Sequence, residues 1–342
     1  MTYLISLIGD YLLPNLLLIK EMERRYDKLL FITSRKMKGF GRGKWLERAL
    51  GLNESEVPRV VVSDEDLNEM IAGLNEHPFS KDDEYIINLT CGTHIMSIGV
   101  YEFFSNYRSS YYYIPMGRGK IEDVRTSADI PLHYRVNVKE YLTLHGLQFE
   151  CNEALYKSKE YTVNLFERYK KANYNRYKIP EILNANYLAD DEDKRYFLGI
   201  WFEEYIYHFL KERLKLKDDC IYTGVKIYRD NSGNQNDNEL DIVYTLNNEL
   251  YIGECKVSMV GPPENRGLKL LEQYMYKLAA ISKDFGLNVN PYIFTLHKFN
   301  ENQRNKIKGI RKRMQILGIK GLIDGDDFKQ DFFESLKTVS YP

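Results

Sequence analysis

The sequence has few features of secreted, membrane or zinc-binding proteins. Its 342 residues include four cysteines with no C-x-x-C spacing, which argues against a zinc site or a disulfide framework and fits a reducing cytoplasm. The net charge of −1 means that any nucleic-acid binding needs a local basic patch. The apolar run at 2–19 lacks a preceding basic region and is interrupted by Asp10 and Pro14. We therefore expect no membrane partner and a cytoplasmic location.

Apolar periodicity divides the chain into three parts and predicts an α/β fold. Residues 1–130 alternate short apolar runs with helical stretches, which predicts a parallel, doubly wound sheet. Residues 131–195 are less regular, and we interpret them as a helical connector that ends in a polar, acidic stretch. Residues 196–342 form a second domain with a different order of elements. The expected strands are 2–9, 28–34, 59–63, 84–90, 111–116, 220–229, 239–246, 249–258 and 291–296, and the expected helices of the two domains are 14–25, 43–50, 64–74, 93–107, 197–215, 267–284 and 300–316.

The carboxyl ends of the expected parallel strands carry small, hydroxyl-bearing and basic residues. Ligands of doubly wound sheets bind outside these ends. Thr90, followed by Gly92-Thr93 and a helix start, offers backbone N–H groups and a helix dipole to an anion. The segment 34–44, SRKMKGFGRGK, is either a positive patch of this site or a flexible surface loop. Phosphate or ribose contacts are the chemistry that these residues favour.

Residues 238–256 predict a β-hairpin with two opposed carboxylates. With Asn247-Asn248 as its turn, Asp241 stands opposite Glu254. Directly opposed side chains have Cβ atoms about 4.5–5.5 Å apart, and like charges there are destabilising. Either one carboxyl keeps its proton or a cation lies between the two.

A divalent cation would relieve this repulsion. Mg²⁺ or Mn²⁺ takes carboxylate and carbonyl oxygens, here from Asp241, Glu254 and the Cys255 backbone. Lys256, beside such an ion, could orient a metal-bound water and stabilise charge on a phosphate, as phosphodiester hydrolysis requires. The alternative is a solvated face on which Glu239, opposite Lys256, forms a salt bridge with it.

The helix before the hairpin brings a further carboxylate. Its sequence, GIWFEEYIYHFL, places Glu203 at the edge of an apolar stripe. The stripe is expected to contain Leu198, Trp201 or Phe202, Tyr205 and Phe209. We expect Glu204 and His208, at positions i and i+4, to form a surface pair.

The second domain resembles the PD-(D/E)xK nuclease fold. The motifs are G-x-W-F-E (199–203), N-E-L-D (238–241) and E-C-K (254–256), in the order helix, three strands, helix and strand. The resemblance implies metal ligation by Glu203, Asp241, Glu254 and Cys255. The catalytic residues that it implies are Glu203, Glu239, Asp241, Glu254, Lys256 and Gln273. Gln273 and Tyr276 look like the accessory glutamine and tyrosine of some members, or else they pack on the sheet.

The first domain resembles the CARF domain, the sensor of cyclic oligoadenylates in type III CRISPR systems. The stretches that carry the resemblance are SLIGDYLLPN (6–15), ITS (32–34) and NLTCGTHIMS (88–97). Relatives commonly read T-G-G-T-K at 90–94, where this chain has a cysteine and a histidine. The residues implied to contact the ligand are Gly9, Asp10, Thr33, Ser34, Thr90, Cys91, Gly92, Thr93 and His94.

A CARF domain followed by a PD-(D/E)xK domain resembles the CARF-nuclease effectors of these systems. That resemblance implies a homodimer that binds one cyclic oligoadenylate, with cyclic tetra-adenylate as first choice. Binding would activate metal-dependent cleavage of single-stranded DNA or RNA, or nicking of duplex DNA. A non-catalytic nucleotide-sensing regulator and a constitutive nuclease remain the alternatives.

The helix expected at 300–316 and the residues after it are strongly basic. The segment 304–320 holds seven lysines and arginines and no acid. It is a candidate track for a nucleic-acid backbone, or a solvated helix whose apolar stripe docks on the sheet. Both descriptions can hold for one amphipathic helix. The stripe comprises Ile307, Ile310, Met314 and Leu317, and the basic residues are Arg304, Lys306, Lys308, Arg311, Lys312, Arg313 and Lys320.

Overall fold

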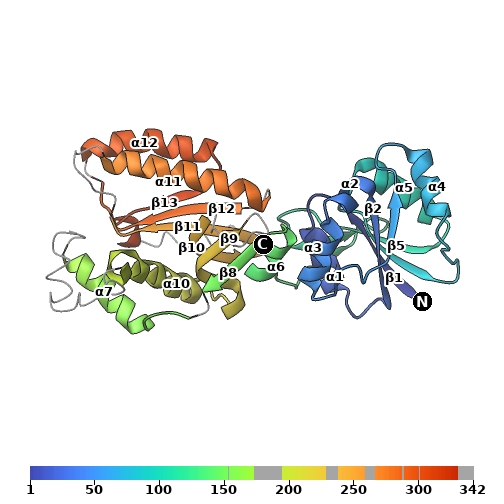
Figure 1. Ribbon diagram of the computed structural model, residues 1–342, viewed down its shortest axis with the longest axis horizontal. Coiled ribbons are helices and arrows are strands. Elements are labelled where there is room, and N and C mark those ends of the chain that lie inside the picture. Colours follow the sequence, from blue (N-terminus) through green and yellow to red (C-terminus); the bar gives the residue numbers. More distant parts are fainter. Residues whose placement is uncertain are drawn as a thin grey trace. The chain divides into compact units, whose positions relative to one another are not determined.

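The computed structural model separates the chain into two compact units, one from Met1 to Leu147 and a second that begins at Gln148 (Figure 1). Most of the predicted acidic stretch and the last residues of the second predicted domain lie outside the described residues. The structure describes residues 1–152, 154–172, 195–228, 238–258, 266–286, 289–299 and 301–329.

The first unit is built on a seven-stranded sheet of order β3-β2-β1-β4-β5-β6-β7, in which the pairs among the first five strands are parallel. Its strand order reverses between β1 and β4, where such sheets bind ligands. The predicted parallel sheet is confirmed, and the antiparallel pair β6-β7 is an addition that we did not predict. The strands are β1 (Thr2–Ile8), β2 (Lys28–Ser34), β3 (Arg59–Val62), β4 (Glu84–Asn88), β5 (Arg108–Tyr113), β6 (Lys120–Asp123) and β7 (Asp129–Pro131).

Side-chain caps start most helices of this unit. Ser34, Asp66 and Thr93 each accept a hydrogen bond from the backbone N–H three residues on, and Asn137 forms a capping box with Glu140. In the segment 34–44, residues 35–39 and 42–44 are helical and residues 40–41 form a turn between them, so the alternative of a loop along the whole segment is wrong. The helices are α1 (Leu13–Glu21), α2 (Arg35–Gly39), α3 (Arg42–Leu50), α4 (Leu67–Asn75), α5 (His94–Phe104) and α6 (Val138–Leu144).

The second unit is built on a six-stranded sheet of order β13-β12-β11-β10-β9-β8. The strands β8 to β11 pair antiparallel, and β11, β12 and β13 pair parallel. The edge strands β8 and β13 were not predicted. The predicted connector thus contributes α6 to the first unit and β8 with α7 (Lys159–Lys171) to the second. The strands are β8 (Gln148–Asn152), β9 (Ile221–Tyr228), β10 (Asn238–Leu246), β11 (Glu249–Lys256), β12 (Val289–Thr295) and β13 (Gly321–Ile323).

Helices cover both faces of this sheet (Figure 1): α7 and α10 (Trp201–Arg213) lie on one face, and α11 (Arg266–Ser282) and α12 (Glu301–Ile316) lie on the other. The first face holds an aromatic core that includes Trp201, Phe202 and Tyr244. On α12, the predicted stripe residues Ile307, Ile310 and Met314 are buried, which confirms that this helix docks by its apolar side. No described helix of the chain is long and apolar enough to span a bilayer.

Two expectations for α10 are wrong. Leu198 is 73% exposed, because it lies in a π-helical turn (Tyr196–Ile200) whose wider spacing breaks the periodicity assumed for the stripe. Glu204 is buried and is not part of a surface pair. Its carboxylate accepts hydrogen bonds from the Tyr196 hydroxyl and the Tyr156 backbone N–H, and burial raises its pKa. One donor from the preceding turn, Tyr196, and one distant in sequence, Tyr156, therefore satisfy a side chain that we assigned to the surface.

We predict that Gly253→Ala destabilises the second unit. A Cβ at Gly253 would stand 2.3 Å from Cγ2 of Ile242 and 2.7 Å from Cε2 of Phe294, both in the buried core. Such overpacking costs about 1–3 kcal/mol, which corresponds to a fall in Tm of roughly 2–10 °C. Gly309→Ala on α12 is the matched control, because a Cβ there meets nothing within 4 Å. Equal melting temperatures for both variants would contradict the packing described.

Candidate functional site

The β10-β11 hairpin has the register predicted from its turn. Asn247 and Asn248 both have positive φ, 52° and 66°, as a two-residue turn of this kind requires. The strands pair from Leu246 with Glu249 to Ile242 with Gly253. The next step in this register places Asp241 opposite Glu254, and both carboxylates contact Lys256.

Lys256 lies between these carboxylates. Its Nζ is 2.8 Å from Oδ2 of Asp241 and 2.8 Å from Oε1 of Glu254. Oδ2 of Asp241 also accepts the backbone N–H of Cys255 at 2.7 Å. Asp241 and Glu254 are 9% and 3% exposed. A partly exposed ammonium group therefore offsets the repulsion between two buried carboxylates.

Asp241 sits at an interruption of the β9-β10 ladder. Its neighbours Leu240 and Ile242 pair with Val225 and Thr223, but Asp241 faces Gly224, whose φ is +56°. The adjacent β8-β9 pairing also shifts register, between Glu150 and Asn152. Irregularities of this kind re-aim side chains near functional sites, and here the Asp241 carboxylate turns to the Cys255 N–H.

Glu239 pairs with Lys226 on the β9 side of the central strand β10. On the β11 side the paired residues end at Ile242 and Gly253, and Lys256 forms its ion pairs with Asp241 and Glu254. The charge of Glu239 still acts on the site, because it is one of the groups that raise the pKa of Glu203. Glu239 is thus a neighbour of the carboxylate cluster and not the ion-pair partner of Lys256 that one alternative required.

Glu203 enters the site from α10, and its pKa is raised to about 9. Burial is the largest cause, and the charge of Asp241 is the next. Burial also raises the pKa of Asp241. For Lys256, burial alone would lower the pKa, but Asp241 and Glu254 raise it overall. At neutral pH the cluster therefore holds a neutral Glu203 beside a charged lysine.

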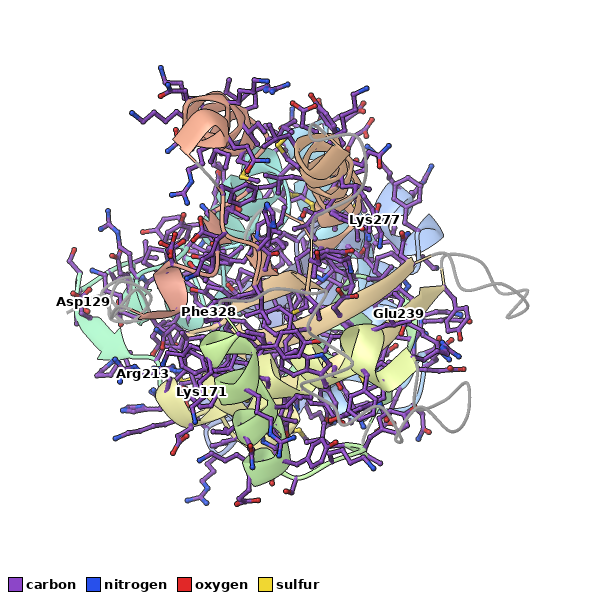
Figure 2. All side chains as sticks on the ribbon, turned by 90° about the vertical axis from the view of Figure 1, so that its left-hand side faces the viewer. Asp129, Lys171, Arg213, Glu239, Lys277 and Phe328 are labelled. Carbon is purple, nitrogen blue, oxygen red and sulfur yellow. The ribbon has the colours of Figure 1, made fainter. Side chains whose placement is uncertain are left out.

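Two residues of α11 that we did not predict approach the cluster. Nζ of Lys277 is 3.5 Å from Oε2 of Glu254, and Nζ of Lys256 lies 5.2 Å from the ring centroid of Tyr274. The predicted residues Gln273 and Tyr276 are exposed on the same helix. Figure 2 shows Lys277 projecting from α11 and Glu239 from the sheet. The spacing of four residues from Gln273 to Lys277 was an available signal, since it places both on one helix face.

The donor chemistry of this cluster suits a hard divalent cation. Asp241, Glu254 and Glu203 offer carboxylate oxygens, which Mg²⁺ and Mn²⁺ prefer. In the described part of the chain, no three Asp, Glu, His or Cys side chains are already gathered as a metal site. The thiol of Cys255 is buried in the aromatic core and burial raises its pKa, so only its backbone carbonyl is a candidate ligand.

A second site lies in the first unit, at the carboxyl ends of its strands. A pocket of about 340 Å³ is found there. Thr33, although predicted, is buried beside it and donates its hydroxyl to the Ser34 carbonyl at 3.3 Å. His94 is exposed at the start of α5 and is not among the lining residues. The predicted residues that line the pocket are Gly9, Asp10, Ser34, Thr90, Cys91, Gly92 and Thr93.

The two loops that form this pocket touch each other through their backbones. A Cβ at Gly9 would lie 2.7 Å from the backbone nitrogen of Gly92, and Gly92 has a φ of +85°. The Cys91 thiol donates to the Tyr11 carbonyl at 3.2 Å. Burial raises the pKa of Cys91 to about 12, so this cysteine joins the loops and is not a nucleophile.

A pair of buried asparagines, which we did not predict, anchors both loops through hydrogen bonds. Asn88 donates to Oδ1 of Asn15 at 3.1 Å, and Asn15 donates to the Leu7 carbonyl at 2.9 Å. Oδ1 of Asn88 accepts the Thr90 N–H at 3.0 Å. Both asparagines are fully buried. They are the last and first residues of the motifs at 6–15 and 88–97, which was the signal in the sequence.

Comparison with known proteins gives a family for each unit. Residues 3–141 match the family model described as the Card1 CARF domain, and residues 190–333 match the Card1-like endonuclease domain. The two-domain α/β fold class predicted from the sequence is thereby confirmed. No curated protein has a matching sequence.

Solved structures share the fold at low sequence identity. Protein VC1899 from Vibrio cholerae aligns with a TM-score of 0.76 and 15% identity, over 99% of this chain and 98% of that one. Can2 from Sulfobacillus thermosulfidooxidans, in complex with cyclic tetra-adenylate, aligns with 0.72 and 16%, over 100% of both chains. A type III CRISPR defence DNA nuclease activated by cyclic oligoadenylate aligns with 0.59 and 17%, over 86% of this chain and 45% of that one.

We predict that Glu203→Gln makes the metal-free protein less sensitive to alkaline pH. The pKa of Glu203 is 4.5 in its ordinary state and about 9 here, so between these values the unfolded chain binds fewer protons than the folded one. Stability therefore falls as pH rises through that range. In thermal melts with a chelator, the variant should exceed wild type by several degrees at pH 8.5 and match it near pH 4.5.

The control for this comparison is Glu212→Gln, on the same helix. The Glu212 side chain is 69% exposed and pairs with Lys159, so its removal should leave the pH profile of the wild type unchanged. If the Tm of Glu203→Gln and of wild type changed in parallel with pH, the raised pKa of Glu203 would be contradicted.

Proposed function

We infer the function from the family to which this chain belongs, the proteins that join a CARF domain of the Card1 type to a Card1-like endonuclease domain. We propose a nuclease of type III CRISPR defence that a cyclic oligoadenylate activates, cyclic tetra-adenylate being the first candidate. The observation that carries this proposal is the convergence of Asp241, Glu254 and Lys256 within an endonuclease domain.

The nuclease site would hold a divalent cation through Asp241, Glu254, Glu203 and the Cys255 carbonyl. A bound Mg²⁺ or Mn²⁺ supplies Lewis acidity at the phosphate and lowers the pKa of bound water. Binding of the cation would release the Glu203 proton to solvent. It would also replace Lys256 as the partner of Asp241 and Glu254. The Lys256 ammonium could then donate to a phosphodiester oxygen and stabilise the negative charge that develops on it.

Other side chains near the cluster could also contribute to cleavage. Lys277 carries a second positive charge next to Glu254, and its side chain is 42% exposed. Gln273, four residues earlier, and Glu239 are the other members of the proposed catalytic set. Lys308 and Lys312 on α12 and Lys320 just before β13 are exposed, whereas Arg311 and Arg313 of α12 form ion pairs with acidic residues. The exposed lysines are candidates for contacts with the backbone of single-stranded or nicked duplex nucleic acid.

The activator would bind the pocket of the first unit. Thr93 caps the N-terminus of α5, where the helix dipole favours an anion, and Gly9 and Gly92 let the two loops of the pocket pack directly against each other. In the proposed homodimer, one copy of the chain would hold part of the ring and a second copy the rest. Activation would then reflect a difference in ligand affinity between two states of the dimer.

We predict that Asp241→Ala and Lys256→Ala each lower cleavage by at least about 100-fold while leaving activator binding intact. The assay uses single-stranded DNA, single-stranded RNA and supercoiled plasmid, with Mn²⁺ and each cyclic oligoadenylate in turn. Lys217→Ala is the control, because Lys217 is exposed just before the Asp218–Cys220 turn and is not one of the residues of the cluster.

Each outcome of this assay has one meaning. Cleavage by Asp241→Ala at the wild-type rate would refute the site. Equal cleavage with and without ligand would indicate a constitutive nuclease. An inactive protein that binds the ligand would indicate a regulator.

We predict that Lys277→Ala lowers cleavage about tenfold and that Lys277→Arg restores most of it, because the charge beside Glu254 returns. Lys269→Ala, an exposed lysine two turns earlier on α11, should cleave as wild type does. A Lys277→Ala protein with unchanged cleavage at all salt concentrations would remove Lys277 from the site.

A further inference from the structure

The pocket of the first unit is lined by acidic side chains, which is unexpected for a site that binds phosphates. Asp10 and Asp64 line it, and none of its described lining residues is a lysine, arginine or histidine. A ligand that carries several phosphates needs positive charge close by, and arginine is the side chain best matched to a phosphate. Basic side chains that contact the lining residues are therefore the candidates in this chain for supplying that charge.

Arg42 is in contact with one of the acidic lining residues. Its Nη2 is 3.1 Å from Oδ1 of Asp10. The guanidinium carbon lies 4.2 Å from the ring centroid of Trp45, one turn along α3. Because the stacked ring restrains the guanidinium, little freedom is lost when it binds a further group. The Asp10 side chain, by contrast, is 70% exposed and can leave without disturbing the core.

The guanidinium still has donors to offer. Nε of Arg42 is buried, and no acceptor for it is found among the described residues. A buried donor without an acceptor is costly in free energy. Within the basic segment 34–44, Arg42 is half-buried, whereas Arg35, Lys36, Lys38 and Lys44 are exposed. Arg42 is thus the least exposed basic residue of this segment, and it contacts the lining residue Asp10.

We propose that Arg42 binds a phosphate group of the anionic ligand in this pocket, in exchange for the Asp10 carboxylate. A phosphodiester offers the guanidinium two oxygens, where Asp10 is held through one contact. Asp10 competes with the ligand for the same cation and repels its phosphates, so the ion pair limits affinity. This inference rests on the proposed function and names one binding residue of that same site.

The experiment measures the affinity of the full-length protein for cyclic tetra-adenylate by calorimetry at several salt concentrations. Arg42→Gln, which keeps part of the contact with Trp45, should weaken binding about 10- to 100-fold. It should also reduce the slope of log Kd against log salt by about one. Arg42→Lys should keep that slope and lose part of the affinity. Asp10→Asn should bind a few-fold more tightly than wild type, which a merely structural role of the pair does not explain.

Arg48→Ala is the matched control on the same helix. Its side chain is 43% exposed and pairs with Glu54, so the variant should bind as wild type does. Thermal melts of all variants report whether the unit still folds. If Arg42→Gln and Asp10→Asn both bind with wild-type affinity and salt dependence, the inference is overturned and the proposed function stands. If the wild-type protein binds no cyclic oligoadenylate, the proposed function and this inference fall together.

Discussion

The second unit depends on a lysine held between two buried carboxylates. Asp241 and Glu254 come together because the Asn247-Asn248 turn fixes the hairpin register, and their repulsion is offset by Lys256. Removing one partner of such a buried group is costly, because the others are left unpaired. The same burial keeps Glu203 protonated at neutral pH. Charge balance thus links the hairpin, α10 and α11 in one cluster.

In the first unit, two loops come into contact where the strand order reverses between β1 and β4. Gly9 and Gly92 permit backbone contact, and the buried pair Asn15–Asn88 supplies the hydrogen bonds that the loops lack from the sheet. A fully satisfied buried network rigidifies its surroundings. The asparagine pair thus holds the two loops that border the pocket, although neither asparagine lines it.

Local signals in the sequence were sufficient for the parallel part of the first sheet, the hairpin register and seven of the residues that line the pocket. Each of these depends on short-range patterns: apolar runs, a two-residue turn and glycine-containing strand ends. Leu198 was assigned wrongly because a π-helical turn changes the helical spacing there, and Glu204 because Tyr196 and the sequence-distant Tyr156 donate hydrogen bonds to it inside the fold. The segment 34–44 was recognised as a possible part of the pocket, but only a tertiary contact singles out Arg42 within it. Lys277 was missed although its spacing from Gln273 places both on one helix face. The short edge strands β8 and β13 have too little periodicity to be recognised.

The position of β8 along the chain has a consequence for how the two functions can be separated. The helix α6 of the first unit ends at Leu144, and β8, which borders β9 in the second sheet, begins at Gln148. The strand β9 in turn carries Gly224, which faces Asp241. A recombination point placed after residue 195 would therefore strip the catalytic sheet of an edge. Module exchange between such proteins has to occur within the few residues before Gln148 if the transplanted nuclease is to keep all its strands.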